Sequence, residues 1–214
     1  MMKKIVLAVI ILAVALSGCV ENKKANEVTF LAPDGVQINA SYFAKSNMTV
    51  ILIHEYNGNR RQWDNFVPVL LANNYSVLTY DMRALDESNY EDSLQDLAGA
   101  VYWVKNNTNS ARIFVIGASF GGNVAFVSSS FSEISASVAI SPIDNKKLGS
   151  SLSYFRPHNV LFMSDIEERQ NAEFLYGFTI PPKDLKIYGG TAHGIEMLQN
   201  RLAVDDILSW LKKY

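Results

Sequence analysis

The sequence predicts an α/β protein with a doubly wound, mostly parallel sheet flanked by helices. Short runs rich in β-branched residues alternate along the chain with longer segments of helical periodicity, which is the pattern of strands joined by crossover helices. Most of the short runs lack polar alternation, as expected of strands that are covered on both faces. A hydrophobic content of 49% over 214 residues suits one domain with a sizeable core.

An antiparallel hairpin is predicted ahead of this sheet, because β-like runs at 28–31 and 36–43 flank the turn signal Pro33-Asp34-Gly35. The strands predicted after it are residues 49–53, 76–80, 112–116, 136–140, 159–163 and 185–188. The predicted helices are residues 60–73, 90–106, 120–131, 168–176 and 195–213. We expect little or no lid, because no stretch between these elements is long enough for a lid domain.

The first residues are predicted to be a lipoprotein signal peptide, residues 1–18. Two lysines precede the apolar run 5–16, which is too short for a comfortable transmembrane helix. Residues 16–19 then read Leu-Ser-Gly-Cys, which resembles the lipobox of prokaryotic lipoproteins, where the cysteine carries the lipid. The alternative is an ordinary secretory signal in which Cys19 has no role.

Cys19 is the only cysteine, so no intrachain disulfide is possible. On the lipoprotein interpretation, residues 19–27 form a polar tether and residues 28–214 the folded domain. We then expect an exported protein whose lipid anchor holds it to the outer face of the cytoplasmic membrane or to another envelope membrane.

Composition argues against several partners. Lysine and arginine total 19 against 21 aspartates and glutamates, for a formal net charge of −2, so nothing indicates nucleic-acid binding. The three histidines are scattered and form no metal-ligand pattern, so we predict no metal and no organic cofactor. The oligomeric state is left open.

Ser119 is the strongest candidate for a functional residue. Residues 117–121 read Gly-Ala-Ser-Phe-Gly, which fits G-x-S-x-G between a β-branched run and a predicted helix. A sharp strand-to-helix turn here exposes the hydroxyl at the carboxyl edge of a parallel sheet, where sites form. The backbone N–H of Phe120 is then free to stabilise an oxyanion. The alternative is a structural turn serine.

A serine nucleophile needs a base, and His193 is the predicted one. It follows the last predicted strand in a glycine-flanked loop, on the same edge as Ser119. His158 precedes the strand 159–163 and is therefore expected at the opposite, amino edge. His54 follows the strand 49–53 on the correct edge, and we expect it to hold its own loop by hydrogen bonds.

Three carboxylates can orient the imidazole of His193, because Asp165, Glu167 and Glu168 all follow the strand 159–163. Spacing alone does not separate them, although Glu167 best fits a solvated carboxylate at a helix start.

The loop after strand 49–53 crosses the same edge and can supply a second oxyanion donor, most plausibly the N–H of Tyr56. Glu55 is unexpected there, because a carboxylate beside the nucleophile repels an oxyanion. We expect its side chain to face solvent or an arginine, such as Arg60 or Arg83.

These pieces together resemble an α/β-hydrolase over nearly all of residues 28–213, and most closely the small, lidless, dienelactone-hydrolase-like esterases. The stretches that carry the resemblance are HEYNGNRRQW at 54–63, DMRALDES at 81–88, GASFGG at 117–122, NVLFMSDIEE at 159–168 and YGGTAHG at 188–194. The His-Glu pair resembles theirs, and in that group the next residue, here Tyr56, contributes an oxyanion N–H. Both glycines of the family's D-x-R-G-x-G-x-S stretch are replaced at 81–88.

The resemblance also bears on which carboxylate orients the imidazole of His193. Ungapped matching to the family's aspartate gives Glu168, whereas a shortened loop gives Asp165. The nucleophile is serine rather than the cysteine of true dienelactone hydrolases, so lactone specificity is not implied. The predicted function is hydrolysis of small carboxylic esters or thioesters through an acyl-enzyme. The alternative is a non-catalytic binding lipoprotein that kept the fold.

Overall fold

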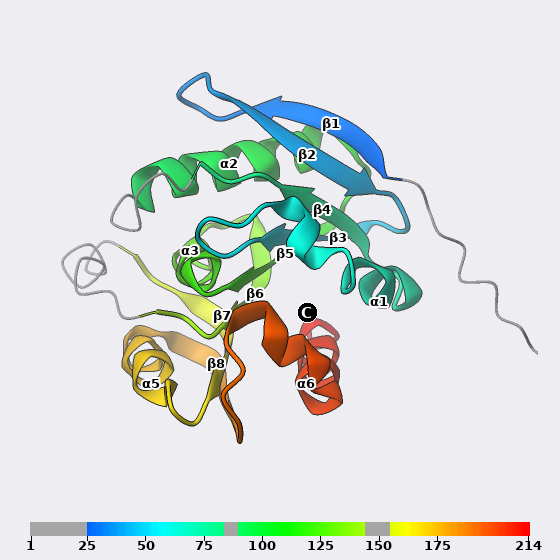
Figure 1. The fold of residues 1–214 in the computed structure, drawn as a ribbon. Helices are drawn as coiled ribbons and strands as arrows, with labels where there is room; N and C mark the ends of the chain where they lie inside the picture. Colours follow the sequence, from blue (N-terminus) through cyan, green and yellow to red (C-terminus); the bar gives the residue numbers. More distant parts are fainter. Residues whose placement is uncertain (1–24, 84–89, 144–154) are drawn as a thin grey trace, which may run out of the picture.

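The computed structural model describes residues 25–83, 90–143 and 155–214 (Figure 1). The predicted signal peptide, the predicted lipid-attachment residue Cys19 and tether residues 19–24 lie outside the described residues, as do residues 84–88 of the 81–88 stretch. The first strand begins at Asn26, two residues before the predicted start of the folded domain. No helix among the described residues is long and apolar enough to cross a membrane.

An eight-stranded sheet forms the centre of the molecule, in the order β1-β2-β4-β3-β5-β6-β7-β8. β1 pairs antiparallel with β2, and β2 pairs antiparallel with β4, whereas every later pairing is parallel. The strands are β1 (Asn26–Leu31), β2 (Gln37–Phe43), β3 (Met48–Ile53), β4 (Ser76–Tyr80), β5 (Arg112–Ala118), β6 (Ile134–Ile140), β7 (His158–Asp165) and β8 (Ile180–Tyr188). The predicted fold class, including the antiparallel hairpin, is confirmed.

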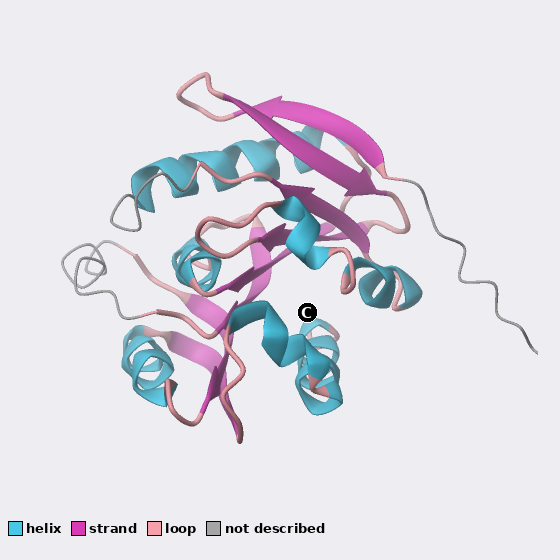
Figure 2. Cartoon of the chain, in the orientation of Figure 1, coloured by secondary structure: helices cyan, strands magenta, loops and turns pink. Residues whose placement is uncertain are grey.

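Helices cover both faces of this sheet (Figure 2). The α-helices are α1 (Val67–Ala72), α2 (Tyr90–Asn107), α3 (Phe120–Ser128), α5 (Arg169–Phe178) and α6 (Arg201–Leu211), and the 3₁₀ helices are η1 (Arg60–Trp63) and η3 (Gly194–Gln199). Within the described residues, no additional domain is inserted between the strands of the sheet.

Strand β5 shows why both faces are apolar. Phe114 and Ile116 pack in a core cluster with η1, α1 and α6, whereas Ile113 and Val115 pack in a second cluster with α2 and α3. Successive residues of a strand point to opposite faces, so a strand covered on both sides is mostly apolar on both faces. A third, smaller cluster joins α3 and α5 to β6 and β7.

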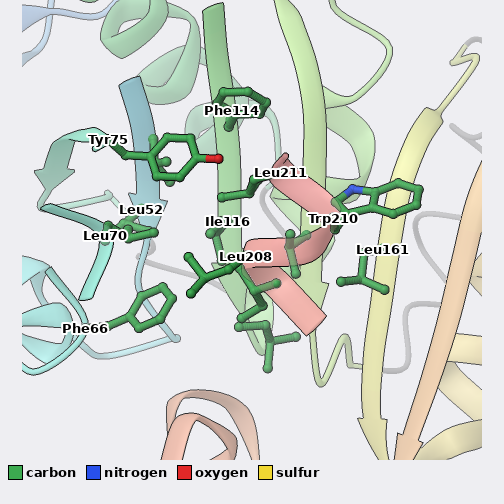
Figure 3. Packing of buried hydrophobic residues seen from close by; sticks show 14 of the residues in the cluster. Leu52, Phe66, Leu70, Tyr75, Phe114, Ile116, Leu161, Leu208, Trp210 and Leu211 are labelled. Carbon is green, nitrogen blue, oxygen red and sulfur yellow. The ribbon is translucent and has the colours of Figure 1, made fainter. Parts of the chain in front are cut away.

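Figure 3 shows the first of these clusters between the sheet and its helices. Leu70 of α1 and Leu208 of α6 point toward Ile116 of β5 (Figure 3), and all three are buried. Burying a leucine or isoleucine side chain stabilises a fold by about 1.5–3 kcal/mol. The two helices are therefore fixed to the sheet at the strands that lead to the candidate site.

Two predicted helices are each broken in two. The segment 60–73 forms η1 and then α1. Pro68 lies in the first turn of α1, where backbone N–H groups have no acceptor within the helix, so its missing N–H costs no hydrogen bond. The segment 195–213 forms η3 and then α6. Asn200 is extended at this break, and its side chain accepts a hydrogen bond from the N–H of Leu202. An asparagine that caps a new helix competes with continuation of the old one.

The last strand is longer than predicted. β8 begins at Ile180 and includes Pro181 and Pro182, although the sequence predicted strand only at 185–188. A proline cannot donate to a neighbouring strand, which argues against a central strand. β8 pairs with β7 alone and forms the edge of the sheet, where prolines are tolerated.

Candidate active site

Ser119 lies in a sharp turn between the end of β5 and the start of α3. Its backbone has φ 55° and ψ −120°, a conformation that residues other than glycine rarely adopt. Such strain costs about 1–3 kcal/mol and persists only where the surrounding structure enforces it. The side chain is 8% exposed. The predicted strand-to-helix turn is thus present, and it raises the hydroxyl at the carboxyl edge of the sheet.

Close backbone packing enforces this turn. A Cβ added to Gly117 would lie 1.9 Å from the carbonyl oxygen of Gly121, and one added to Gly121 would lie 2.5 Å from the carbonyl oxygens of Ile53 and His54. No side chain fits at either position, because both neighbours are backbone atoms. The flanking glycines of the motif therefore allow α3 to approach the end of β3.

His193 brings the serine and a carboxylate together. Its Nε2 lies 2.8 Å from Ser119 Oγ, and its Nδ1 lies 2.7 Å and 2.9 Å from the two carboxylate oxygens of Glu168. A carboxylate only accepts hydrogen bonds, so Nδ1 carries the proton and Nε2 accepts from the serine hydroxyl. The His193 and Glu168 side chains are 39% and 38% exposed, so this end of the chain of contacts is open to solvent.

Within the described residues, no hydrogen bond joins Asp165 or Glu167 to the imidazole of His193. Asp165 is buried at the end of β7, and its Oδ1 accepts a hydrogen bond of 3.0 Å from the N–H of Glu167. It therefore shapes the turn that leads to Glu168. Glu167 is exposed, as the sequence suggested for a solvated carboxylate. Of the alternatives left open by spacing, the structure brings only Glu168 to His193.

Two backbone amides are available beside the serine. Phe120 is the first residue of α3, so its N–H lacks a partner within the helix. Neither this N–H nor that of Tyr56 has an acceptor within the described parts of the chain. The rings of Tyr56 and Phe120 lie 6.2 Å apart, centroid to centroid. The amides predicted to stabilise an oxyanion thus come from adjacent segments.

His54 holds the loop after β3, as predicted. Its Nδ1 donates to the carbonyl of Glu55 at 2.6 Å, and its Nε2 accepts from the N–H of Met82 at 2.9 Å. Acceptance at Nε2 requires a neutral imidazole, and burial lowers the pKa of His54. His158 begins β7 at the amino edge and contacts the carbonyl of Arg156, far from the serine edge as predicted.

Glu55 was expected to face solvent or an arginine, and its half-buried side chain instead contacts amide N–H groups. Its Oε1 accepts a hydrogen bond of 2.8 Å from the N–H of Ile195, and its Oε2 lies 3.5 Å from Nε2 of Gln62. The carboxylate also packs against Gly194, where an added Cβ would lie 1.8 Å from Oε1. No residue pattern could have predicted this contact, because the donor is a backbone amide 140 positions away.

Both arginines that were expected near Glu55 bind other carboxylates. Arg60 pairs with Asp81 and Glu27, which ties the first strand to η1. Arg83 pairs with Asp96 on α2 and with Asp34 in the hairpin turn. Burial raises the pKa of Asp96, and the hydrogen bonds from Arg83 oppose that rise. These pairs tie the elements of the fold together, so neither Arg60 nor Arg83 neutralises the Glu55 carboxylate.

No group of three or more histidine, cysteine, aspartate or glutamate side chains in the described ranges could hold a metal ion. The arrangement that the structure does contain is a serine, an imidazole and a carboxylate joined in series, with two amides nearby. Such a series is suited to moving a proton from the hydroxyl to the imidazole as the hydroxyl oxygen attacks an electrophile.

Comparison with known proteins gives the family. The model of the α/β hydrolase fold family matches residues 49–180, so the chain belongs to that family. No curated protein matches the sequence. The family assignment rests on a match to more than half of the chain, and it agrees with the sheet order and the serine turn described above.

Several solved structures share the fold. The esterase Pf2001 of Pyrococcus furiosus aligns with a TM-score of 0.73 at 22% identity, over 89% of this chain and 93% of that one. A dienelactone hydrolase of Anabaena variabilis gives 0.75 at 18% identity, over 89% and 98%. XC6422 of Xanthomonas campestris, described as a serine hydrolase without a lid, gives 0.68 at 15% identity, over 89% and 94%. At these identities the likeness concerns the fold.

Proposed function

We propose that the protein is a serine hydrolase that cleaves small carboxylic esters or thioesters through an acyl-enzyme. The observation that carries the proposal is the unbroken series from Ser119 Oγ through His193 to Glu168, with contacts of 2.8 Å and 2.7 Å. The esterases and hydrolases among the similar structures support the same class of reaction.

In the proposed mechanism, Ser119 Oγ attacks the acyl carbon while His193 Nε2 takes its proton. The imidazolium is stabilised by the Glu168 carboxylate and passes the proton to the leaving alcohol or thiol, which departs. Water then attacks the acyl carbon while His193 takes a proton from it, and the imidazolium returns that proton to Ser119 Oγ. This step releases the carboxylic acid and restores the serine.

The negative charge that develops on the carbonyl oxygen needs donors that are already in place. The amides of Phe120 and Tyr56 fit this requirement, because neither has another acceptor within the described parts of the chain. Removing one oxyanion donor of this kind costs an enzyme about 10²–10³ in kcat. The partial exposure of His193 and Glu168 suits a small substrate that reaches the site directly from solvent.

We further propose that the protein is exported and attached to a membrane through lipid on Cys19. This rests on residues 1–19 of the sequence, a short apolar run followed by Leu-Ser-Gly-Cys. Metabolic labelling with a fatty-acid analogue tests it: label is expected on the full chain and is expected to disappear in Cys19→Ala. Equal labelling of both chains contradicts the proposal.

The function is tested with p-nitrophenyl acetate and a fluorophosphonate probe. Ser119→Ala is expected to lower kcat/KM at least about 10³-fold and to abolish labelling, because the nucleophile is gone. Ser141→Ala is the matched control: Ser141 also has positive φ and follows the neighbouring strand β6. It is expected to keep activity and labelling. A wild-type protein that neither turns over ester nor takes the label would instead favour a non-catalytic binding lipoprotein.

A further inference from the structure

Glu55 joins the two loops that carry the proposed reaction. Its backbone belongs to the loop after β3, where its N–H donates to Gln62 Oε1 at 3.2 Å. Its side chain reaches the histidine loop, residues 189–195, where Oε1 accepts a hydrogen bond of 2.8 Å from the N–H of Ile195. The residue after Glu55 is Tyr56, whose amide is a proposed oxyanion donor. One residue is therefore bonded to both sides of the site.

The histidine loop leads into η3, and His193 occupies the capping position at the start of that helix. Helices commonly begin with a serine, threonine, aspartate or asparagine whose side chain accepts one of the first free N–H groups. The His193 side chain makes no such bond, since its imidazole contacts Ser119 and Glu168. The free N–H of Ile195 therefore needs an acceptor from outside the loop, and Glu55 provides it.

Gly194 makes room for this carboxylate. It is buried and has φ 56°, and an added Cβ would lie 1.8 Å from Oε1 of Glu55. The short distance excludes a side chain at this position while the carboxylate is in place, and the positive φ itself favours glycine. The residue directly after His193 is thus fitted to Glu55 both in space and in conformation.

Few other hydrogen bonds fix the histidine loop. Within the described residues, those that join it to segments outside the loop and η3 are the contacts of the His193 ring and the bond from Ile195 to Glu55. In the proposed reaction the contact between Nε2 and Ser119 Oγ must break and form again as the proton moves. The loop then depends on a contact that takes no part in the proton transfer.

We propose that Glu55 is a positioning residue whose hydrogen bond to Ile195 keeps His193 Nε2 within reach of Ser119 Oγ. The inference rests on the proposed function. A misplacement of about 1 Å caused by a change outside the reacting groups can lower a rate about 10²-fold. The effect on folding is expected to be small, because one hydrogen bond in a half-buried setting has a small net effect on stability.

The test compares Glu55→Ala with Glu55→Gln in the full chain by p-nitrophenyl acetate turnover, fluorophosphonate labelling and urea denaturation. Glu55→Ala is expected to lower kcat/KM and the labelling rate about 10–10²-fold, with a nearly unchanged urea midpoint. Glu55→Gln keeps an oxygen that accepts from the N–H of Ile195, so both rates are expected within about threefold of wild type.

Glu196→Ala is the matched control. Glu196 is exposed on η3, and within the described residues its side chain forms no hydrogen bond or ion pair. The substitution removes a carboxylate of the same size and charge from the neighbourhood of the histidine loop. It is expected to leave turnover, labelling and the urea midpoint at their wild-type values.

Gly194→Ala tests the same contact from the other side, because the Glu55 carboxylate must move away from the added Cβ. This variant is expected to lower kcat/KM about tenfold or more. In a Glu55→Ala background the obstructing carboxylate is absent, so the same substitution is expected to lower kcat/KM less than about threefold. Such non-additivity is characteristic of two residues that share one contact.

The outcomes separate this inference from the proposed function. Wild-type activity in Glu55→Ala or in Gly194→Ala overturns the inference and leaves the hydrolase proposal intact. An equal loss in Glu55→Gln and Glu55→Ala overturns it too, because charge rather than the hydrogen bond would be responsible, and so does an equal loss in Glu196→Ala. Loss of activity that only follows the unfolded fraction also overturns it. Absence of Ser119-dependent turnover and labelling in the wild-type chain overturns both proposals.

Discussion

The serine turn and the histidine loop form two halves of one site, and they are held in place by different means. Ser119 is 8% exposed and lies among backbone atoms that leave no room for a side chain at Gly117 or Gly121. His193 is 39% exposed, and the contacts that hold its loop come from the carboxylates of Glu168 and Glu55. One half is fixed by the backbone and the other by side chains.

This difference teaches where stability and activity are separable. A change in the serine half alters the packing of α3 on the sheet and therefore the folding free energy. A change in the histidine half removes a hydrogen bond that is close to solvent, where its net contribution to folding is small. We expect substitutions in the two halves to divide accordingly between loss of fold and loss of activity.

The largest effect on stability is expected from Gly117→Ala. Its Cβ would lie 1.9 Å from the carbonyl oxygen of Gly121, so the turn must open, at a cost of about 3 kcal/mol or more. Urea denaturation measures the change. Gly177→Ala, on α5, is the matched control: nothing lies within 4 Å of its added Cβ, and a gain of about 0.5–1 kcal/mol is expected. Similar losses in both variants would contradict the comparison.

In the histidine half, Glu168→Gln is expected to lower kcat about 10²–10⁴-fold while leaving the urea midpoint nearly unchanged. An amide at this position can hold the wrong imidazole tautomer and does not stabilise the imidazolium. Steady-state kinetics and denaturation on the same preparation check both parts. The matched variant is Asp165→Asn, which changes the buried turn below Glu168 and should affect stability more than kcat. If Asp165→Asn instead lowered kcat and Glu168→Gln instead lowered stability, Asp165 would be the carboxylate that orients His193.

The smallest effect concerns His54, which belongs to the buried half. Burial lowers its pKa below the ordinary value of 6.5, so the unfolded chain binds a proton that the folded chain does not. The folded state therefore loses stability as the pH falls below 6.5, and the loss ends below the folded-state pKa. The slope is at most about 1.4 kcal/mol per pH unit. Imidazole resonances of His54 that titrate at or above pH 6.5 would rule this out.

The sequence predicts the sheet well because its signals are local. Runs such as 113–116 are apolar at every position, and the G-x-S-x-G stretch follows one of them directly. The turn at Ser119 and the approach of His193 to it both follow from strand order at one edge.

Other features escaped prediction because they depend on contacts across the fold. The helical periodicity of 195–213 hides the break at Asn200, where a side-chain cap competes with the helix. The prolines of β8 argue against a strand unless its place at the sheet edge is known. Glu55 was expected to face solvent or an arginine, but Arg60 and Arg83 each have a carboxylate partner that is distant in sequence.

Strand polarity has a practical consequence for attaching this protein to a surface. β1 starts opposite Tyr42, near the place where β2 ends and β4 begins, and the guanidinium of Arg112 at the start of β5 donates to the carbonyl of Tyr214. The start of β1 and the carboxyl end of the chain therefore both lie at the amino edge of the parallel strands, opposite the edge that carries Ser119. A molecule held through the start of β1 or through its carboxyl end will turn the edge that carries Ser119 outward, toward whatever diffuses past.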